Sequence, residues 1–134
     1  MFKTLICWLL ALFFAFAGVA HFALVDSFAA IVPPALPFKP IIVQLTGLME
    51  LAFAYGLIVP RWRRVTGWAL SAYLLAVLPA NIYMALEGMP LGPLGTPAAL
   101  WGRVAMQFPL IALVLWACGT IPRASRQTPP PEQA

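Results

Sequence analysis

Four long apolar segments dominate the sequence, and prolines, glycines or charged residues separate each one from the next. They cover about residues 5–24, 41–59, 65–86 and 98–119. An α-helix of about 20 residues is ~30 Å long, which matches the thickness of the hydrocarbon core of a bilayer. The pattern therefore predicts four membrane-spanning helices and an all-α fold.

The stretches between and after these segments differ in character. Residues 26–40 are apolar but contain four prolines, which exclude a continuous helix there. We expect this stretch either to rest at the membrane interface or to fold back over the helices as a lid, and the sequence leaves both arrangements open. The polar, proline-rich residues 123–134 are expected to form a disordered cytoplasmic tail. Residues 1–122 would then form one transmembrane domain.

The first apolar segment has two interpretations. Lys3 and the small residues Ala15 and Ala17 are compatible with a cleaved signal peptide. The apolar stretch is longer than the core of a signal peptide, and its length suits a complete membrane crossing. We therefore expect a retained helix.

Basic residues predict the orientation of the helices. Two of them, Lys39 and Arg103, fall on one side of the expected membrane. The other side carries six: Lys3, Arg61, Arg63, Arg64, Arg123 and Arg126. Because basic residues accumulate on the cytoplasmic side, both termini are expected in the cytoplasm. Short connections favour an antiparallel four-helix bundle, multi-pass in the cell membrane, which we take to be a bacterial inner membrane.

Composition supports a membrane protein and excludes other classes. Hydrophobic residues make up 63% of the chain and charged residues 9%, whereas a soluble domain carries about 25% charged residues. The net charge of +4 does not indicate a nucleic-acid partner, because the basic residues lie at the ends of apolar segments and form no continuous stripe. Membrane lipid is the expected partner, with another membrane subunit or a homo-oligomer as further options.

A few polar residues interrupt the apolar segments. Glu50 lies at the middle of its segment, where a charge costs about 2.5 kcal/mol or more, so it needs a partner. Arg103 and Gln107 are four residues apart and share a helix face. We expect a polar network in the outer half of the membrane, with Glu50 paired to Arg103 and with His21, Asn81 and Gln107 completing it. The network would either bind a ligand or hold the bundle together.

Metal and thiol chemistry receive less support. One histidine and one buried glutamate lack the third ligand that zinc usually requires, so we expect no metal, and a single histidine excludes a bis-histidine haem. Cys7 and Cys118 are not in a CxxC motif and are expected near the inner interface. They are either inert buried thiols or a redox pair, and a reducing cytosol disfavours a lasting disulfide.

Five strings follow one another over roughly residues 17–116: AGVAHF, SFAAIVPPALPF, LTGLMELAFAYGLIVPRWRR, LPANIYMAL and GRVAMQFPLIALVLW. Together they resemble the DoxX-like family of small four-helix integral membrane proteins. Within these strings the resemblance is carried by His21, Pro33 and Pro34, Glu50 after Gly47, Pro79 with Asn81 and Tyr83, and Arg103 with Gln107.

The resemblance implies the four-helix architecture and an association with redox chemistry. The family is named after a subunit of a thiosulfate:quinone oxidoreductase, and more distant relatives are assembly factors. The first reading of the polar network is therefore an accessory redox component that binds a quinone or a similar amphiphile in an outer-half polar pocket. The absence of a CxxC motif departs from the thiol-exchanging relatives. A non-enzymatic membrane scaffold or assembly chaperone is the alternative, a small-molecule transporter is a third reading, and the sequence does not decide whether the protein is an enzyme.

Overall fold

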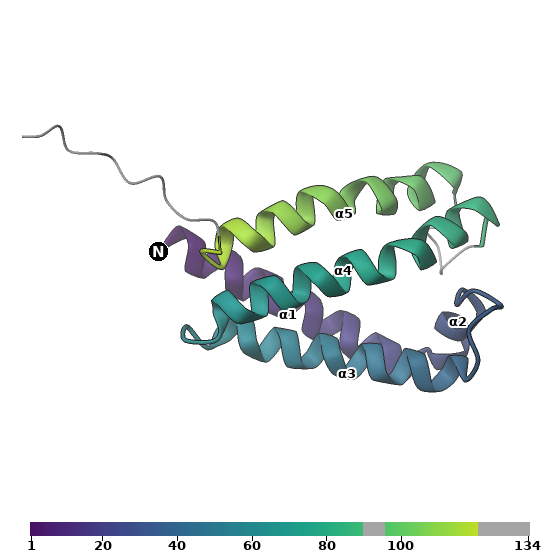
Figure 1. Ribbon diagram of the computed structural model, residues 1–134, viewed down its shortest axis with the longest axis horizontal. Coiled ribbons are helices and arrows are strands. Elements are labelled where there is room, and N and C mark those ends of the chain that lie inside the picture. The colour runs from purple at the N-terminus through teal and green to yellow at the C-terminus, as the bar shows by residue number, and fades with distance from the viewer. Residues whose placement is uncertain (90–95, 121–134) are drawn as a thin grey trace, which may run out of the picture.

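The computed structural model describes residues 1–89 and 96–120, and every regular element in these residues is an α-helix. There are four long helices and one short one: α1 (Phe2–Ala23), α2 (Val25–Ala30), α3 (Lys39–Ile58), α4 (Arg63–Leu86) and α5 (Pro97–Ala117) (Figure 1). The four long helices are all long and apolar enough to cross a membrane. The predicted all-α fold with four long apolar helices is thus confirmed. The expected tail, residues 123–134, lies outside the described residues.

Apolar side chains cover the outside of these helices. Phe16 on α1 is 77% exposed and Met106 on α5 is 64% exposed. A soluble protein would hide such continuous apolar surface, whereas lipid solvates it. This is the surface of a multi-pass membrane protein.

Helices α1 and α3 pack together through glycine. A Cβ atom on Gly18 would lie 2.8 Å from the backbone oxygen of Gly47, and a Cβ atom on Gly47 would lie 2.7 Å from the Cβ of His21. Neither glycine can therefore be replaced without moving the helices apart. Such close backbone contact is a usual way to join helices when the solvent is as apolar as the side chains. The crossing brings His21 and Glu50, each three residues after one of these glycines, to adjacent positions.

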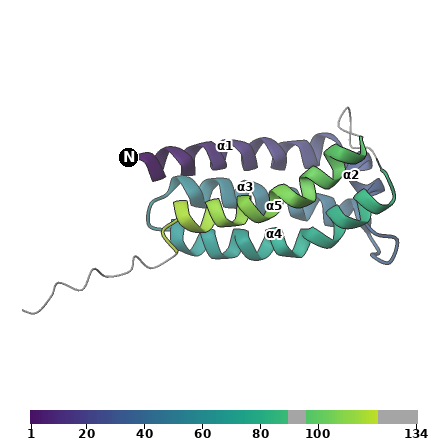
Figure 2. The same cartoon turned by 90° about the horizontal axis from the view of Figure 1, so that it is seen from above.

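Helices α4 and α5 form the second close pair, and the two pairs share a core at the end of the molecule that carries Met1 (Figure 2). The core is entirely apolar apart from two thiols and the Tyr73 hydroxyl. It consists of Cys7, Leu10, Ala11, Phe14, Ala54, Leu57, Leu70, Tyr73, Leu74, Val114, Ala117 and Cys118.

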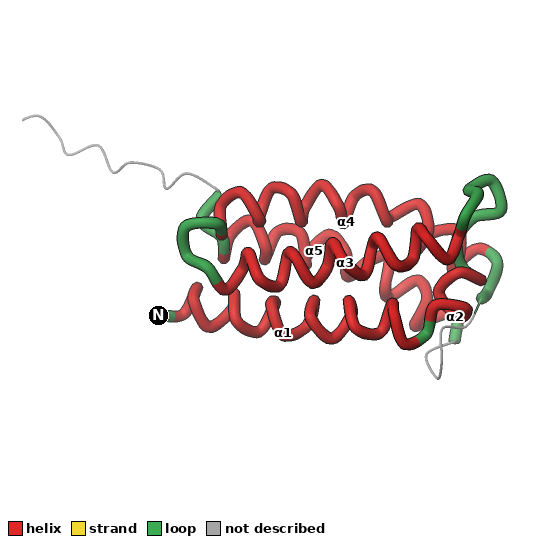
Figure 3. Tube along the Cα trace, turned by 90° about the horizontal axis from the view of Figure 1, so that it is seen from below, coloured by secondary structure: helices red, strands yellow, loops and turns green. Residues whose placement is uncertain are grey.

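Basic side chains satisfy helix ends next to this core. Lys3 Nζ donates a hydrogen bond to the Trp116 backbone oxygen at 2.7 Å, and Arg63 Nε donates to the Leu57 oxygen at 2.8 Å. The last carbonyl groups of a helix have no partner within the helix, so these bonds complete α5 and α3. They also place the beginnings of α1 and α4 and the ends of α3 and α5 at one end of the molecule (Figure 3).

The proline-rich stretch contains no continuous helix, as predicted. It begins with α2, whose six residues end before the first proline. Beyond α2 the chain turns back, and Ile31, Val32 and Leu36 line the cavity described below. Phe38 then adopts a left-handed backbone conformation, with φ of 55°, at the start of α3. The segment therefore covers one end of the space between the helices.

Candidate functional site

The two helix pairs part toward the end that carries α2 (Figure 1), and a cavity of about 1320 Å³ lies between them. Its walls come from all five helices and are mostly apolar. The cavity exists partly because one face of α4 is formed by short side chains. Ala69, Ala72, Ala76 and Ala80 recur at helical spacing, and all four line the space that they are too short to fill. Its polar lining residues are His21, Thr46, Glu50, Tyr73, Asn81, Arg103 and Gln107.

Glu50 is the central polar residue of the α1–α3 wall. It is only 7% exposed. Its Oε1 accepts a hydrogen bond from the Tyr73 hydroxyl on α4 at 2.8 Å, and its Oε2 lies 3.2 Å from His21 Nδ1. Oε2 receives no hydrogen bond within the described part of the chain. The carboxylate thus connects the two helix pairs through Tyr73 and faces the histidine on its other side.

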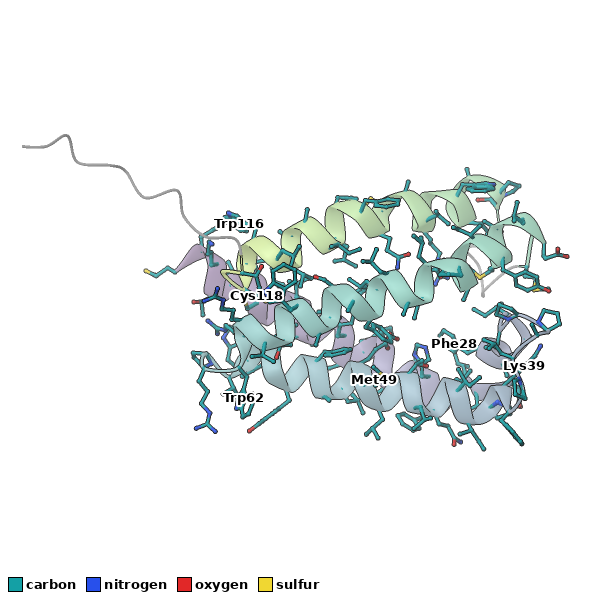
Figure 4. All side chains as sticks on the ribbon, viewed as in Figure 1. Phe28, Lys39, Met49, Trp62, Trp116 and Cys118 are labelled. Carbon is teal, nitrogen blue, oxygen red and sulfur yellow. The ribbon has the colours of Figure 1, made fainter. Side chains whose placement is uncertain are left out.

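The His21 ring is held by three neighbours. Its Nδ1 lies 2.8 Å from the Ala17 backbone oxygen as well as near Glu50. Its face stacks on Phe28 of α2, with ring centroids 4.2 Å apart and an interplanar angle of 18°. Figure 4 shows Phe28 on the inner side of α2, level with the space between the pairs. Both atoms near Nδ1 are acceptors, so this nitrogen carries a proton.

A second polar cluster ties α4 to α5. Asn81 Nδ2 donates to Gln107 Oε1 at 3.0 Å, and Gln107 Nε2 donates to the Leu74 backbone oxygen. Gln107 is 4% exposed, so its amide needs these partners. Pro79 leaves the Leu75 carbonyl, four residues before it, without a helical donor, and the Leu74 carbonyl is next to it in the chain. The cluster therefore ties α4 to α5 in the turn before its internal proline.

Arg103 lines the cavity but does not reach Glu50, so the expected Glu50–Arg103 pair is wrong. Glu50 has His21 and Tyr73 as partners, and Arg103 makes no ion pair or side-chain hydrogen bond within residues 1–89 and 96–120. Nor do the five predicted residues form one network. His21 lies against Glu50, and Asn81 donates a hydrogen bond to Gln107. Arg103 lines the cavity without joining either pair.

Sequence reasoning missed two polar residues of the cavity, Thr46 and Tyr73, and of these Tyr73 contacts Glu50. Tyrosines of membrane helices often lie at the interface, where the hydroxyl is hydrated. Tyr73, however, is ten residues after Arg63, at the middle of α4. A hydroxyl at that depth needs a protein partner, and this depth is the signal that points to it. Ser71, which is also buried on α4, donates to the Gly67 oxygen of its own helix at 2.8 Å.

The two cysteines lie apart from this site. Both are buried and free, and neither lines the cavity. Cys7 Sγ contacts the Ala117 backbone oxygen at 3.7 Å, and Cys118 packs on the Gly67 backbone. Figure 4 places Cys118 with Trp116 at the end of the molecule that carries Met1. Within the described residues, no three side chains of histidine, cysteine, aspartate or glutamate gather in a group able to hold a metal ion.

A family model described as a domain of unknown function, DUF8561, matches residues 10–118. The chain belongs to the DUF8561 family. The match includes every polar residue of the cavity and excludes Cys7. No curated protein and no solved structure matches this DUF8561 chain.

Proposed function

We propose that this protein is an integral membrane protein that binds a quinone or a similar amphiphile between its two helix pairs, as an accessory component of a redox system. The observation that carries the proposal is the cavity of about 1320 Å³, which combines long apolar walls with a few polar groups. Ligand sites are typically of this kind, with apolar walls for the bulk of the ligand and a small number of polar groups that orient it.

The ligand enters from the bilayer in this proposal. Apolar residues of the α3–α4 side and of the α1–α5 side both line the cavity, including Met49 and Phe53 on one side and Met106 and Leu110 on the other. An amphiphile already dissolved in the membrane would place its tail along these residues. Its head group would then meet His21, Asn81 and Arg103.

The proposed arrangement is an antiparallel four-helix bundle with both termini in the cytoplasm, as in a bacterial inner membrane. Lys3, Arg61, Arg63 and Arg64 gather at the end that carries Met1, which favours that end as the cytoplasmic one. The cavity and α2 would then lie toward the outer face. The resemblance to DoxX-like proteins agrees with this arrangement and with a redox association.

The test is mass spectrometry of small molecules that stay with the protein after extraction in native lipid particles. Ala76→Phe adds a ring on the alanine wall and is expected to empty the cavity, and Arg103→Ala is expected to lose ligand by removing a polar contact. Ala105→Phe is the matched control, because Ala105 lies on α5 but not in the cavity wall. An amphiphile retained by the wild type and the control and lost from both variants supports the proposal.

The competing function, a non-enzymatic scaffold or assembly chaperone, predicts a different result. No amphiphile would be retained by any of the four proteins, although all four would be folded. Arg103→Ala would then be silent, because Arg103 holds no partner within the described residues. That outcome would overturn ligand binding.

A further inference from the structure

We propose that the amphiphile in the cavity carries an acidic head group and that its oxyanion pairs with the guanidinium of Arg103. This inference rests on the proposed function, because it names the head-group chemistry of a ligand in the same cavity. It follows from a cation inside a membrane-spanning helix that has no partner of opposite charge among the described residues.

Arg103 lies where a charge is costly. It is the seventh residue of α5, about 9 Å along the helix from Pro97, and its half-buried side chain lines the cavity. A charged group inside a membrane-spanning segment needs a partner, and such residues mark ligand or ion sites. The basic residues that favour the cytoplasmic end gather at the opposite end of the molecule, so membrane orientation does not explain Arg103.

Lys39 shows the contrast with an ordinary interfacial cation. It is the first residue of α3 and does not line the cavity. Figure 4 places it at the end of the molecule that carries α2. A lysine at the end of a helix can extend its ammonium group to the hydrated head groups of the lipid. Lys39 therefore needs no partner from the protein, whereas Arg103 borders a mostly apolar cavity.

The exposed acidic residues do not supply the missing charge. Asp26 on α2 and Glu87 after α4 are both exposed, and neither forms an ion pair within the described residues. A further acidic residue, Glu132, lies outside those residues. Of the acidic side chains in the structure, this leaves Glu50.

Glu50 is committed to other partners. Its Oε1 accepts from the Tyr73 hydroxyl, and its Oε2 lies 3.2 Å from His21 Nδ1. With a neutral His21 ring, the charges of Glu50 and Arg103 cancel in sum but stay apart, and with a protonated ring the cavity wall carries a net positive charge. Arg103 lacks a contact anion in both states. An oxyanion that touches Arg103 gains more from this contact than it loses to the more distant Glu50, because charge interactions weaken with distance.

An oxyanion also matches the shape of the guanidinium. Arginine has N–H donors in a planar fork, and a group whose two oxygens share one negative charge accepts two of them in parallel. Neutral carbonyl and hydroxyl groups can accept these hydrogen bonds too, but they leave the charge of Arg103 uncompensated in an apolar environment. Charge is therefore the property that Arg103 selects. A carboxylate has it, and so does a hydroxynaphthoquinone, whose ionised ring shares the charge between two oxygens.

The experiment compares two quinones that have the same alkyl tail, with the full chain in nanodiscs of zwitterionic lipid at weakly alkaline pH. One is a hydroxynaphthoquinone, which is ionised, and the other is the corresponding methylnaphthoquinone, which is neutral. After correction for partition into empty nanodiscs, the wild type is expected to bind the acid about tenfold more tightly or better, equivalent to about 1.4 kcal/mol. Arg103→Gln should bring the ratio close to one. Lys39→Gln, which removes a cation at the same end but outside the cavity wall, is the matched control and should keep the wild-type ratio.

A fatty acid and the fatty alcohol of the same length repeat the comparison without a quinone ring. A preference for the acid in the quinone pair supports an oxyanion on a redox ligand. A preference in the fatty pair alone supports pairing of Arg103 with an acidic lipid, and it overturns the redox part of the proposed function.

Three results would overturn the pairing with Arg103. Equal binding of acid and neutral probe by the wild type would show that phospholipid phosphate or water compensates Arg103, and it leaves ligand binding intact. An acid preference that persists in Arg103→Gln excludes Arg103 as the recognition group. Binding of no probe by the wild type overturns both proposals for these head groups. If Arg103→Gln does not fold, Arg103→Lys takes its place, since it keeps the charge and loses the planar fork. A reduced preference is then expected, and an unchanged one overturns the pairing with the guanidinium.

Discussion

The two ends of the molecule use the same four helices in opposite ways. At the end that carries Met1, the two helix pairs meet, and Leu57, Leu70 and Val114 are completely buried between them. Toward α2 the pairs part, and the space between them contains the polar side chains that the sequence places inside the membrane. One end therefore packs the two helix pairs together, and the other end contains the cavity with its polar side chains.

The difference arises from side-chain size on α4. Leu70 is completely buried between the pairs, whereas Ala69, Ala72, Ala76 and Ala80 on the cavity side of the helix leave space open. A gap of this size costs dispersion contacts, and no protein atoms replace them. Lipid or a ligand can fill the gap without rearranging the helices, so the contact between the two pairs depends mainly on the packed end.

The difference between the two ends is tested most clearly by removing one side chain from each end. Leu70→Ala, at a residue that is 0% exposed, is expected to cost about 2–5 kcal/mol of stability, as large-to-small changes in a packed core do. Met106→Ala, at a cavity residue that is 64% exposed, should cost far less. Thermal unfolding in detergent, followed by circular dichroism, measures both. Equal losses would mean that the two ends are packed alike.

Two glycines provide the next largest contrast. Gly47→Ala places a methyl group 2.7 Å from the His21 Cβ and 3.0 Å from the Gly18 oxygen. Overpacking of this kind costs about 1–3 kcal/mol and would separate His21 from Glu50. Gly102→Ala is the control, because its new methyl group would meet nothing within 4 Å. It should be neutral or stabilising by up to about 1 kcal/mol. The same unfolding assay serves here, and a loss of stability in both variants would contradict the role given to the α1–α3 crossing.

The long helices could be predicted because each is encoded locally, by about 20 consecutive apolar residues. Helix α2 could not, since six residues before a run of prolines give too short a pattern. Most polar residues of the cavity could also be predicted from the sequence, because a charged or amide side chain is conspicuous within an apolar segment. The hydrogen-bond partners of these residues were misjudged, and the polar cavity residues Thr46 and Tyr73 were not predicted.

The prediction that Glu50 pairs with Arg103 was wrong because helical phase shows which residues share a face of one helix but not which helices are in contact. Arg103 was chosen for Glu50 on charge alone. The sequence does hold a better signal, since His21 follows Gly18 and Glu50 follows Gly47 by the same three residues. If the two glycines meet, the two side chains must meet as well. Tyr73 could be suspected from its depth, but its partner depends on how α3 and α4 are arranged.

A smaller effect is expected where the two ends join. Gln107→Leu removes the donor to the Leu74 oxygen and the acceptor for Asn81, with little change in volume. Hydrogen bonds between membrane helices contribute about 0.6 kcal/mol on average and up to about 1.7 kcal/mol. Because two bonds are lost, a decrease of about 1–2 kcal/mol is expected in the same unfolding assay. No decrease would show that the cluster does not stabilise the contact between α4 and α5.

The smallest expected effect tests whether the end that contains the cavity helps to hold the two helix pairs together. Tyr73→Phe keeps the ring in the shared core and removes only the hydroxyl that donates to Glu50 across the two pairs. The expected loss is about 0.6 kcal/mol, the average for one such bond. A double-mutant cycle with Glu50→Met isolates the interaction, because methionine has a similar length and no oxygen to accept the bond, so the bond is absent in both single variants and its energy appears as the coupling. A coupling of several kcal/mol would mean that the carboxylate holds the pairs together. Glu50 would then be a structural tie, and the contrast between a cohesive end and a ligand-binding end would no longer hold.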